Sequence, residues 1–147
     1  MKSYWDSSAL VKLYVTEVYS SEVSQYAQTL LHPLQLSHLH DLELKNGLRL
    51  KVFRKEASAE SVAASLKLLD NDLSSGVLIR PELNWFDVFR RAEGLSEAHS
   101  RRLGCRSLDV LHVSSALILK AEDFVTFDDR QAAIAKQAGL KIVDVKG

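Results

Sequence analysis

Short apolar segments alternate with longer segments of helical character along most of the chain, and this order constrains the fold most strongly. Five short segments are typical of strands: Ser3–Trp5, Leu34–Leu36, Val77–Ile79, Phe124–Thr126 and Lys141–Val145. Between and after them, helices are predicted over Ser20–Leu31, Ser37–Phe53, Ser58–Leu73, Trp85–Ser100, Leu108–Leu119 and Gln131–Gln137. Strands that are separated by helices pair in parallel through crossover connections. The order therefore predicts an α/β fold with a mainly parallel central β-sheet flanked by α-helices.

The length and composition indicate one globular domain. The chain has 147 residues, the usual size of a single domain, and no repeat or Pro/Gly-rich linker divides it, so residues 1–147 are expected to form one unit. No apolar run approaches the roughly 20 residues of a membrane span, and the N-terminus lacks the pattern of a secretory signal. The single cysteine, Cys105, cannot form an internal disulfide. A cytoplasmic protein without a membrane partner is expected.

The charges of the chain cancel, with 19 basic and 19 acidic residues. No global field therefore attracts nucleic acid, and an anionic partner must be held by a local patch. Two groups of basic residues are candidates for phosphate contacts: Arg49, Lys51, Arg54 and Lys55, and then Arg101, Arg102 and Arg106. The alternative for both groups is a solvated surface or a contact with a partner.

Acidic residues follow the predicted strands or open the next helices. Asp6 follows the first strand, Asp109 stands just behind the predicted cap Ser107, and Asp128 and Asp129 follow "FVTF". In parallel sheets, ligands gather at the carboxyl ends of the strands, which makes these acids candidates for a site. Taken singly, each could instead cap a helix, since a carboxylate accepts hydrogen bonds from the first backbone N–H groups.

Glu43 is a further candidate, in the helix predicted after the second strand. It shares one side of that helix with Leu42 and Phe53, while Leu44 and Leu48 lie on the opposite side. A helix covered on both sides would hold Glu43 inward, where a divalent cation can compensate the cost of burying a carboxylate. The alternative is an acid at the edge of the apolar stripe with its head group in water.

Converged carboxylates point to a hard divalent cation. Three or four of them at one sheet edge would repel one another without a cation, and Mg²⁺ or Mn²⁺ takes oxygen ligands. The single cysteine excludes a cysteine-based zinc site, and the sequence has no HExxH, GxxxxGK[ST] or GxSxG motif. A carboxylate-held metal site for phosphate chemistry is the enzymatic interpretation that remains.

Four segments carry a resemblance to a known family. In order, "YWDSSALVKLY", "LHDLELKNGL", "SLDVLHVSSAL" and "FVTFDDRQAAIAKQAGLKIV" resemble the motifs of PIN-domain ribonucleases, and most closely those of toxins from VapBC-type toxin–antitoxin systems. The resemblance spans essentially the whole chain. It implies four catalytic and metal-binding acids, Asp6, Glu43, Asp109 and Asp128. It also implies supporting hydroxyls at Ser8 and Thr126, and leaves Asp129 as an extra acid.

The resemblance implies an activity and partners as well. It implies a Mg²⁺- or Mn²⁺-dependent endoribonuclease that hydrolyses RNA phosphodiester bonds, acts as a toxin, binds a small antitoxin protein and forms a homodimer. His112, three residues after Asp109, is expected to be a hydrogen-bonded structural histidine. The sequence departs from the commoner pattern at Ser7, where Thr is frequent, and at the bulky Trp5, which could alter the floor of the site.

Alternatives to a toxin remain open. A PIN-domain nuclease in RNA processing would carry the same acids, and a non-catalytic α/β signalling or binding domain would share the fold. A receiver domain needs an acidic pair after its first strand, which "YWDSS" does not supply. A phosphatase of the haloacid-dehalogenase type needs D-x-D, and Ser8 occupies its second acidic position.

Overall fold

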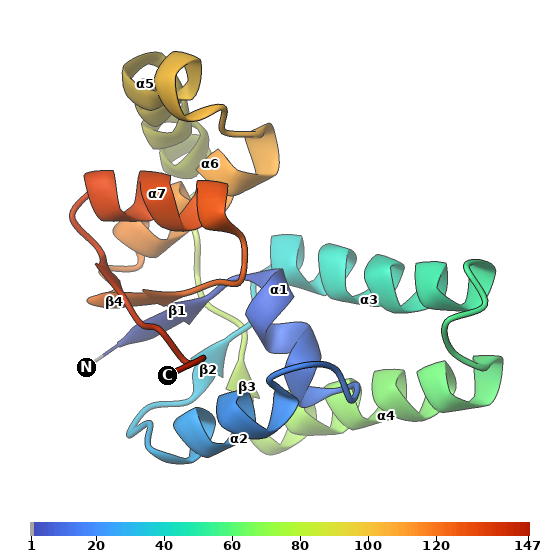
Figure 1. Ribbon diagram of the computed structural model, residues 1–147. Coiled ribbons are helices and arrows are strands. Elements are labelled where there is room, and N and C mark those ends of the chain that lie inside the picture. Colours follow the sequence, from blue (N-terminus) through green and yellow to red (C-terminus); the bar gives the residue numbers. More distant parts are fainter. Residues whose placement is uncertain (1) are drawn as a thin grey trace.

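The computed structural model describes residues 2–147, within which five short strands run parallel in two small sheets (Figure 1). The first sheet has the order β1 (Ser3–Trp5), β4 (Asp123–Val125), β5 (Lys141–Ile142). The second pairs β2 (Leu34–Gln35) with β3 (Leu78–Ile79). β2 packs beside β1 without joining its ladder. The predicted class, a mainly parallel α/β fold, is confirmed.

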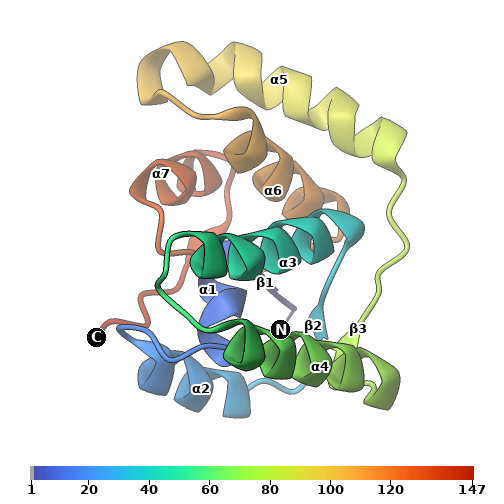
Figure 2. The same cartoon turned by 90° about the vertical axis from the view of Figure 1, so that its right-hand side faces the viewer.

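Helices cover both sides of these strands. They are α1 (Ser7–Leu10), the 3₁₀ helix η1 (Val11–Leu13), α2 (Ser20–Gln28), α3 (His38–Phe53), α4 (Ala59–Ser75), α5 (Trp85–Leu103), α6 (Ser107–Ile118) and α7 (Asp129–Gln137). Figure 1 shows α5, α6 and α7 on one side of the strands and α1 to α4 on the other. Figure 2 shows α3 and α4 side by side as a helical hairpin. Within residues 2–147, none of the helices has the length and apolar character needed to traverse a bilayer.

The core is divided by the alternation of side chains along β1 and β4. Trp5 and Val125 point to one face and pack against α1, α2 and α4, whereas Tyr4 and Phe124 point to the other face and pack against α6 and α7. Tyr4 lies directly opposite Phe124 in the parallel register, and their rings stack. Trp5 is thus a core residue, and the expectation that it shapes the floor of the site is not met.

Several element boundaries differ from the prediction. α2 ends at Gln28, three residues early, whereas α5 continues to Leu103 and ends at Gly104, whose φ of +68° suits glycine. Ser107 is the first residue of α6 rather than its cap, which is Arg106.

α3 is buried on one face only. His40, Leu44 and Leu48 face the core, whereas Leu42 and Phe53 are 69% and 83% exposed. The expectation that this helix is covered on both sides is wrong, because α1 and α4 cover a single face of it. Glu43 reaches inward from the edge of that face.

Candidate active site

A cavity of about 300 Å³ opens at the carboxyl ends of β1 and β4. The structure brings all four predicted acids into its lining: Asp6, Glu43, Asp109 and Asp128. They come from the end of β1, from α3, from the first turn of α6 and from the N-terminus of α7. A larger cavity of about 700 Å³ beside α2 and α4 has Glu56 as its one carboxylate. The chemistry of the smaller cavity therefore makes it the candidate site.

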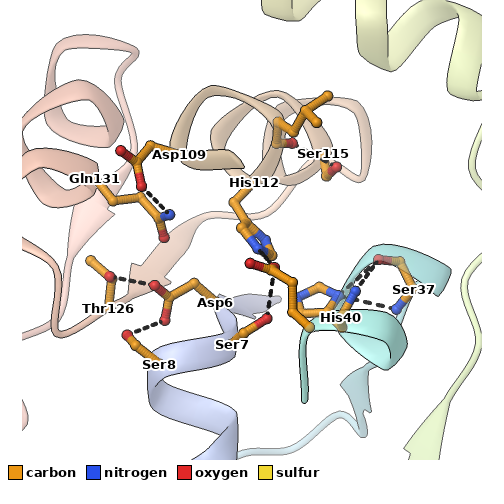
Figure 3. A network of polar contacts seen from close by, with 12 residues as sticks. Asp6, Ser7, Ser8, Ser37, His40, Asp109, His112, Ser115, Thr126 and Gln131 are labelled. Atoms are coloured by element: carbon orange, nitrogen blue, oxygen red, sulfur yellow. Dashed lines mark hydrogen bonds and ion pairs between the residues drawn. The ribbon is translucent and has the colours of Figure 1, made fainter. Parts of the chain in front are cut away.

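Asp6 caps α1 and faces this cavity at the same time. Its Oδ1 accepts a hydrogen bond from Ser8 Oγ at 2.7 Å (Figure 3). The same oxygen accepts one from the Ala9 backbone N–H at 3.0 Å. Its Oδ2 accepts a hydrogen bond from Thr126 Oγ1 at 2.6 Å. Burial raises the pKa of Asp6, and these donors together with His112 oppose that rise. The two hydroxyls expected to support the first acid thus contact its two oxygens.

Asp109 is buried and held from two elements. Its Oδ2 accepts hydrogen bonds from the backbone N–H of Arg106 at 2.9 Å and from Arg106 Nε at 3.2 Å. Its Oδ1 accepts from Arg106 Nη2 at 3.4 Å and from Gln131 Nε2 at 3.3 Å. Gln131 belongs to α7 and is 3% exposed. Sequence reasoning missed Gln131, because nothing in a single glutamine three residues after Asp128 signals a site.

Glu43 belongs to a chain of polar contacts that runs into the core. Its Oε1 accepts a hydrogen bond from Ser7 Oγ at 2.9 Å and contacts His112 Nε2, while His112 Nδ1 lies 2.7 Å from the Tyr4 hydroxyl. Burial raises the pKa of Glu43, but the hydrogen bond and charge of His112 and the hydrogen bond from Ser7 outweigh burial, so its pKa lies below the ordinary value. His112 is hydrogen-bonded, as expected, and it fixes the carboxylate of Glu43.

The proton of the Tyr4 phenol sets the direction of the hydrogen bonds from Tyr4 through His112 to Glu43. Burial, followed by the charge of Asp6, raises the pKa of Tyr4 well above its ordinary value, so the phenol keeps its proton. When the His112 ring is neutral, the phenol O–H donates to Nδ1; whether the ring is neutral or protonated, Nε2–H donates to Glu43.

His40 joins the start of α3 to the end of β1. Burial lowers the pKa of His40 to about 3, so the ring is neutral. Its Nδ1 accepts a hydrogen bond from the Ser37 backbone N–H at 3.1 Å (Figure 3). Its Nε2 donates to the Trp5 carbonyl at 2.7 Å. This contact places Glu43, one turn along α3, beside the residues that follow β1. The Ser37-x-x-His40 spacing of a capping box was the one available signal for His40 in the sequence.

Asp128, rather than Asp129, lines the cavity. Its Oδ1 caps α7 through the backbone N–H groups of Arg130 and Gln131, and its Oδ2 pairs with Arg106 Nη2 at 2.5 Å. Thr126 Oγ1 accepts a hydrogen bond from the backbone N–H of Asp128 at 3.0 Å, which ties Asp128 to the hydroxyl that donates to Asp6.

Solved structures share this arrangement of elements, although no protein-family model and no curated protein matches the sequence. FitAcB from Neisseria gonorrhoeae has a TM-score of 0.66 at 12% identity, with 98% of each chain covered. VapC20 from Mycobacterium tuberculosis, a sarcin–ricin loop cleaving toxin, has a TM-score of 0.66 at 14% identity, over 89% of this chain and 93% of that chain. VapBC-1 from nontypeable Haemophilus influenzae has a TM-score of 0.66 at 16% identity over 100% of both chains. The chain has the PIN-domain fold.

The donor set of this PIN domain fits a hard divalent cation. Within residues 2–147, no three His, Cys, Asp or Glu side chains are arranged so that they could hold a metal ion. In this arrangement the carboxylates of Asp109 and Asp128 pair with Arg106. However, four carboxylates line one cavity, and Gln131 Oε1, also in its lining residues, is buried without a hydrogen-bond partner in the described part of the chain. An orphaned carbonyl oxygen among carboxylates is a donor that Mg²⁺ or Mn²⁺ accepts.

Proposed function

We propose that this PIN-domain protein is a Mg²⁺- or Mn²⁺-dependent endoribonuclease that hydrolyses RNA phosphodiester bonds. The observation that carries the proposal is the convergence of Asp6, Glu43, Asp109 and Asp128 from four separate elements on one cavity. Two of them, Asp6 and Asp109, are almost fully buried. Buried acids are costly to a fold without a compensating cation, so their retention together favours a functional role.

The chain supplies positioning around the metal ligands. Asp6, Glu43, Asp109 and Asp128 would hold the cation, which lowers the pKa of a water molecule and neutralises charge on the phosphate. Ser8 and Thr126 fix the carboxylate of Asp6. The contact between Ser8 and Asp6 gives Ser8 a positioning role, since its hydroxyl donates to an acid that the proposal assigns to the metal.

Cleavage of total cellular RNA in the presence of Mn²⁺ tests the proposal. The wild-type protein is expected to cleave RNA, and cleavage is expected to stop when the metal is chelated. Asp109→Asn is expected to reduce the rate by at least about 100-fold, the upper end of what loss of an outer-shell partner costs a metal site. Glu60→Gln, at an exposed acid in the first turn of α4, is the matched control. Equal rates in all three proteins, or no cleavage by the wild type with either metal, would overturn the proposed nuclease activity.

Two neighbouring acids provide an internal comparison for the same assay. Asp128→Asn removes a carboxylate of the cavity but keeps an oxygen that can cap α7, so we expect cleavage to fall roughly 10- to 100-fold with little change in melting temperature. Asp129→Asn, outside the cavity lining, should leave the rate within about twofold of wild type. A larger loss from Asp129→Asn would exchange the roles assigned to the two residues.

The toxin role and its antitoxin are part of the proposal. They are supported by the motifs shared with VapBC-type toxins and by the fold shared with the toxin VapC20. Exposed aromatic rings on α5, Phe86 and Phe89, support a protein partner or a homodimer at that helix. Growth arrest on production of the wild-type chain alone, absent with Asp109→Asn, distinguishes a toxin from a nuclease of RNA processing.

A further inference from the structure

Arg106 places a positive charge between two acids of the cavity. Its guanidinium contacts both oxygens of Asp109, with Nε 3.2 Å from Oδ2 and Nη2 3.4 Å from Oδ1, and Nη2 also lies 2.5 Å from Asp128 Oδ2. No other Arg or Lys of the described chain lines this cavity. The two acids therefore share a single local cation, and it comes from the protein itself.

The guanidinium reaches these acids from the rim. The side chain of Arg106 is 62% exposed, whereas that of Asp109 is 3% exposed. Asp109 is also held independently of the guanidinium, by the backbone N–H of Arg106 and by Gln131 Nε2. The arginine side chain can therefore leave without releasing Asp109 from its place in the first turn of α6.

A guanidinium and a divalent cation compete for the same oxygens. A carboxylate oxygen that accepts two hydrogen bonds, as Asp109 Oδ2 does from Arg106, has no lone pair left to bind a metal. Two positive groups on one carboxylate also repel each other. Binding of a cation by Asp109 and Asp128 thus requires the guanidinium to move away from them.

We propose that Arg106 is a built-in counter-cation that alternates with the divalent cation at Asp109 and Asp128, and that the displaced guanidinium binds a phosphate of the RNA at the rim. The inference rests on the proposed nuclease function and assigns a positioning residue to it. The planar fork of a guanidinium, which is bidentate on Asp109 here, matches two phosphate oxygens equally well. The guanidinium would neutralise the two acids before the metal arrives, and its displacement would couple metal binding to substrate binding.

Mn²⁺ titration by calorimetry, without RNA, tests the first half. Arg106→Ala is expected to bind Mn²⁺ roughly tenfold more tightly than the wild type, because the competing cation is gone, and to melt at a lower temperature when metal-free. Arg101→Ala, which removes the same charge from an exposed position of α5 outside the cavity lining, should bind Mn²⁺ like the wild type. Arg106→Lys should fall in between, since one ammonium cannot bridge both acids.

Steady-state cleavage of a short single-stranded RNA tests the second half. Arg106→Ala is expected to raise KM for RNA roughly tenfold despite its tighter metal binding, with a smaller change in kcat. Equal Mn²⁺ affinity in the Arg106→Ala and Arg101→Ala variants, or no Mn²⁺ binding by any variant, would overturn the competition. An unchanged KM would overturn the phosphate contact. Tighter Mn²⁺ binding by Arg106→Ala in a protein that cleaves no RNA would instead count against the proposed function alone.

Discussion

Asp6→Asn is expected to raise the melting temperature of the metal-free protein while strongly reducing RNA cleavage. Asp6 is 3% exposed, and burial raises its pKa, so its ionised form is a cost to the folded protein at neutral pH. An asparagine keeps an acceptor for Ser8 and presents an amide N–H to Thr126. The gain should be about 2–4 °C, the shift that roughly 1 kcal/mol produces in a domain of this size. Loss of the carboxylate should reduce cleavage about 1000-fold.

The raised pKa of Asp6 also predicts how the free energy of unfolding changes with pH. The folded-state pKa of Asp6 lies above its unfolded value, so between the two values the folded protein holds a proton that the unfolded chain has lost. The free energy of unfolding therefore falls as pH rises through the folded pKa, and this fall should be absent in Asp6→Asn. His40 acts in the opposite direction: its pKa is lowered to about 3, so its contribution is lost as pH falls below about 6.5. Both proteins share His40, so their difference isolates Asp6.

The melting temperatures of the wild type and of Asp6→Asn are measured from acidic to neutral pH, once with chelator and once with Mn²⁺. Mn²⁺ should raise the melting temperature of the wild type and leave that of Asp6→Asn almost unchanged, since binding to the folded state alone stabilises it. Glu60→Gln serves again as the exposed control. A lower melting temperature for Asp6→Asn at every pH would mean that the carboxylate is needed for folding, and a stabilisation by Mn²⁺ equal to that of wild type would remove Asp6 from the metal site.

Position relative to the strands made much of the site predictable. Asp6 directly follows β1, and Asp128 comes shortly after the end of β4. Because the two strands are parallel neighbours, their carboxyl ends lie together at one edge of the sheet. The split of the strands into two sheets was not predictable, because β2 and β3 contribute only two residues each and their pairing depends on packing rather than on pattern. The fold class thus follows from the order of the elements, whereas the pairing of the strands within the sheets does not.

Glu43 was selected by an argument that the structure corrects. The sequence placed it on one side of the helix with Leu42 and Phe53, but those two side chains are exposed. The carboxylate of Glu43 is instead directed to the cavity by its contacts with Ser7 and His112. Contacts of this kind depend on rotamers and on neighbours more than 30 residues away along the chain. The contacts of Arg106 and Gln131 with the acids also depend on rotamers, and those that join α6 to α7 depend on how the two helices pack. Arg106 belonged to a charge cluster with a solvated surface as its alternative, and a lone glutamine in a helical segment carries no signal at all.

Removing the imidazole of His112 is expected to have the second large effect, on stability and cleavage together. His112 is 1% exposed and connects Tyr4, also buried, to Glu43. His112→Ala leaves a cavity and an unpaired phenol in the core, which should lower the free energy of unfolding by about 2–4 kcal/mol. It also frees the Glu43 carboxylate, and loss of such a partner reduces the activity of a metal site by roughly 10- to 100-fold.

Two further variants separate the structural part of this effect from the positioning part. Tyr4→Phe breaks the contact to Nδ1 and leaves the contact to Glu43, so it should cost about 1 kcal/mol with less than a threefold loss of cleavage. His112→Gln offers an amide N–H toward Glu43 and should recover part of the cleavage lost in His112→Ala. Urea unfolding and RNA cleavage with Mn²⁺ are measured on all three variants. If cleavage instead followed stability alone, with His112→Gln no better than His112→Ala at equal stability, His112 would be a core residue and Glu43 would be held by Ser7 alone.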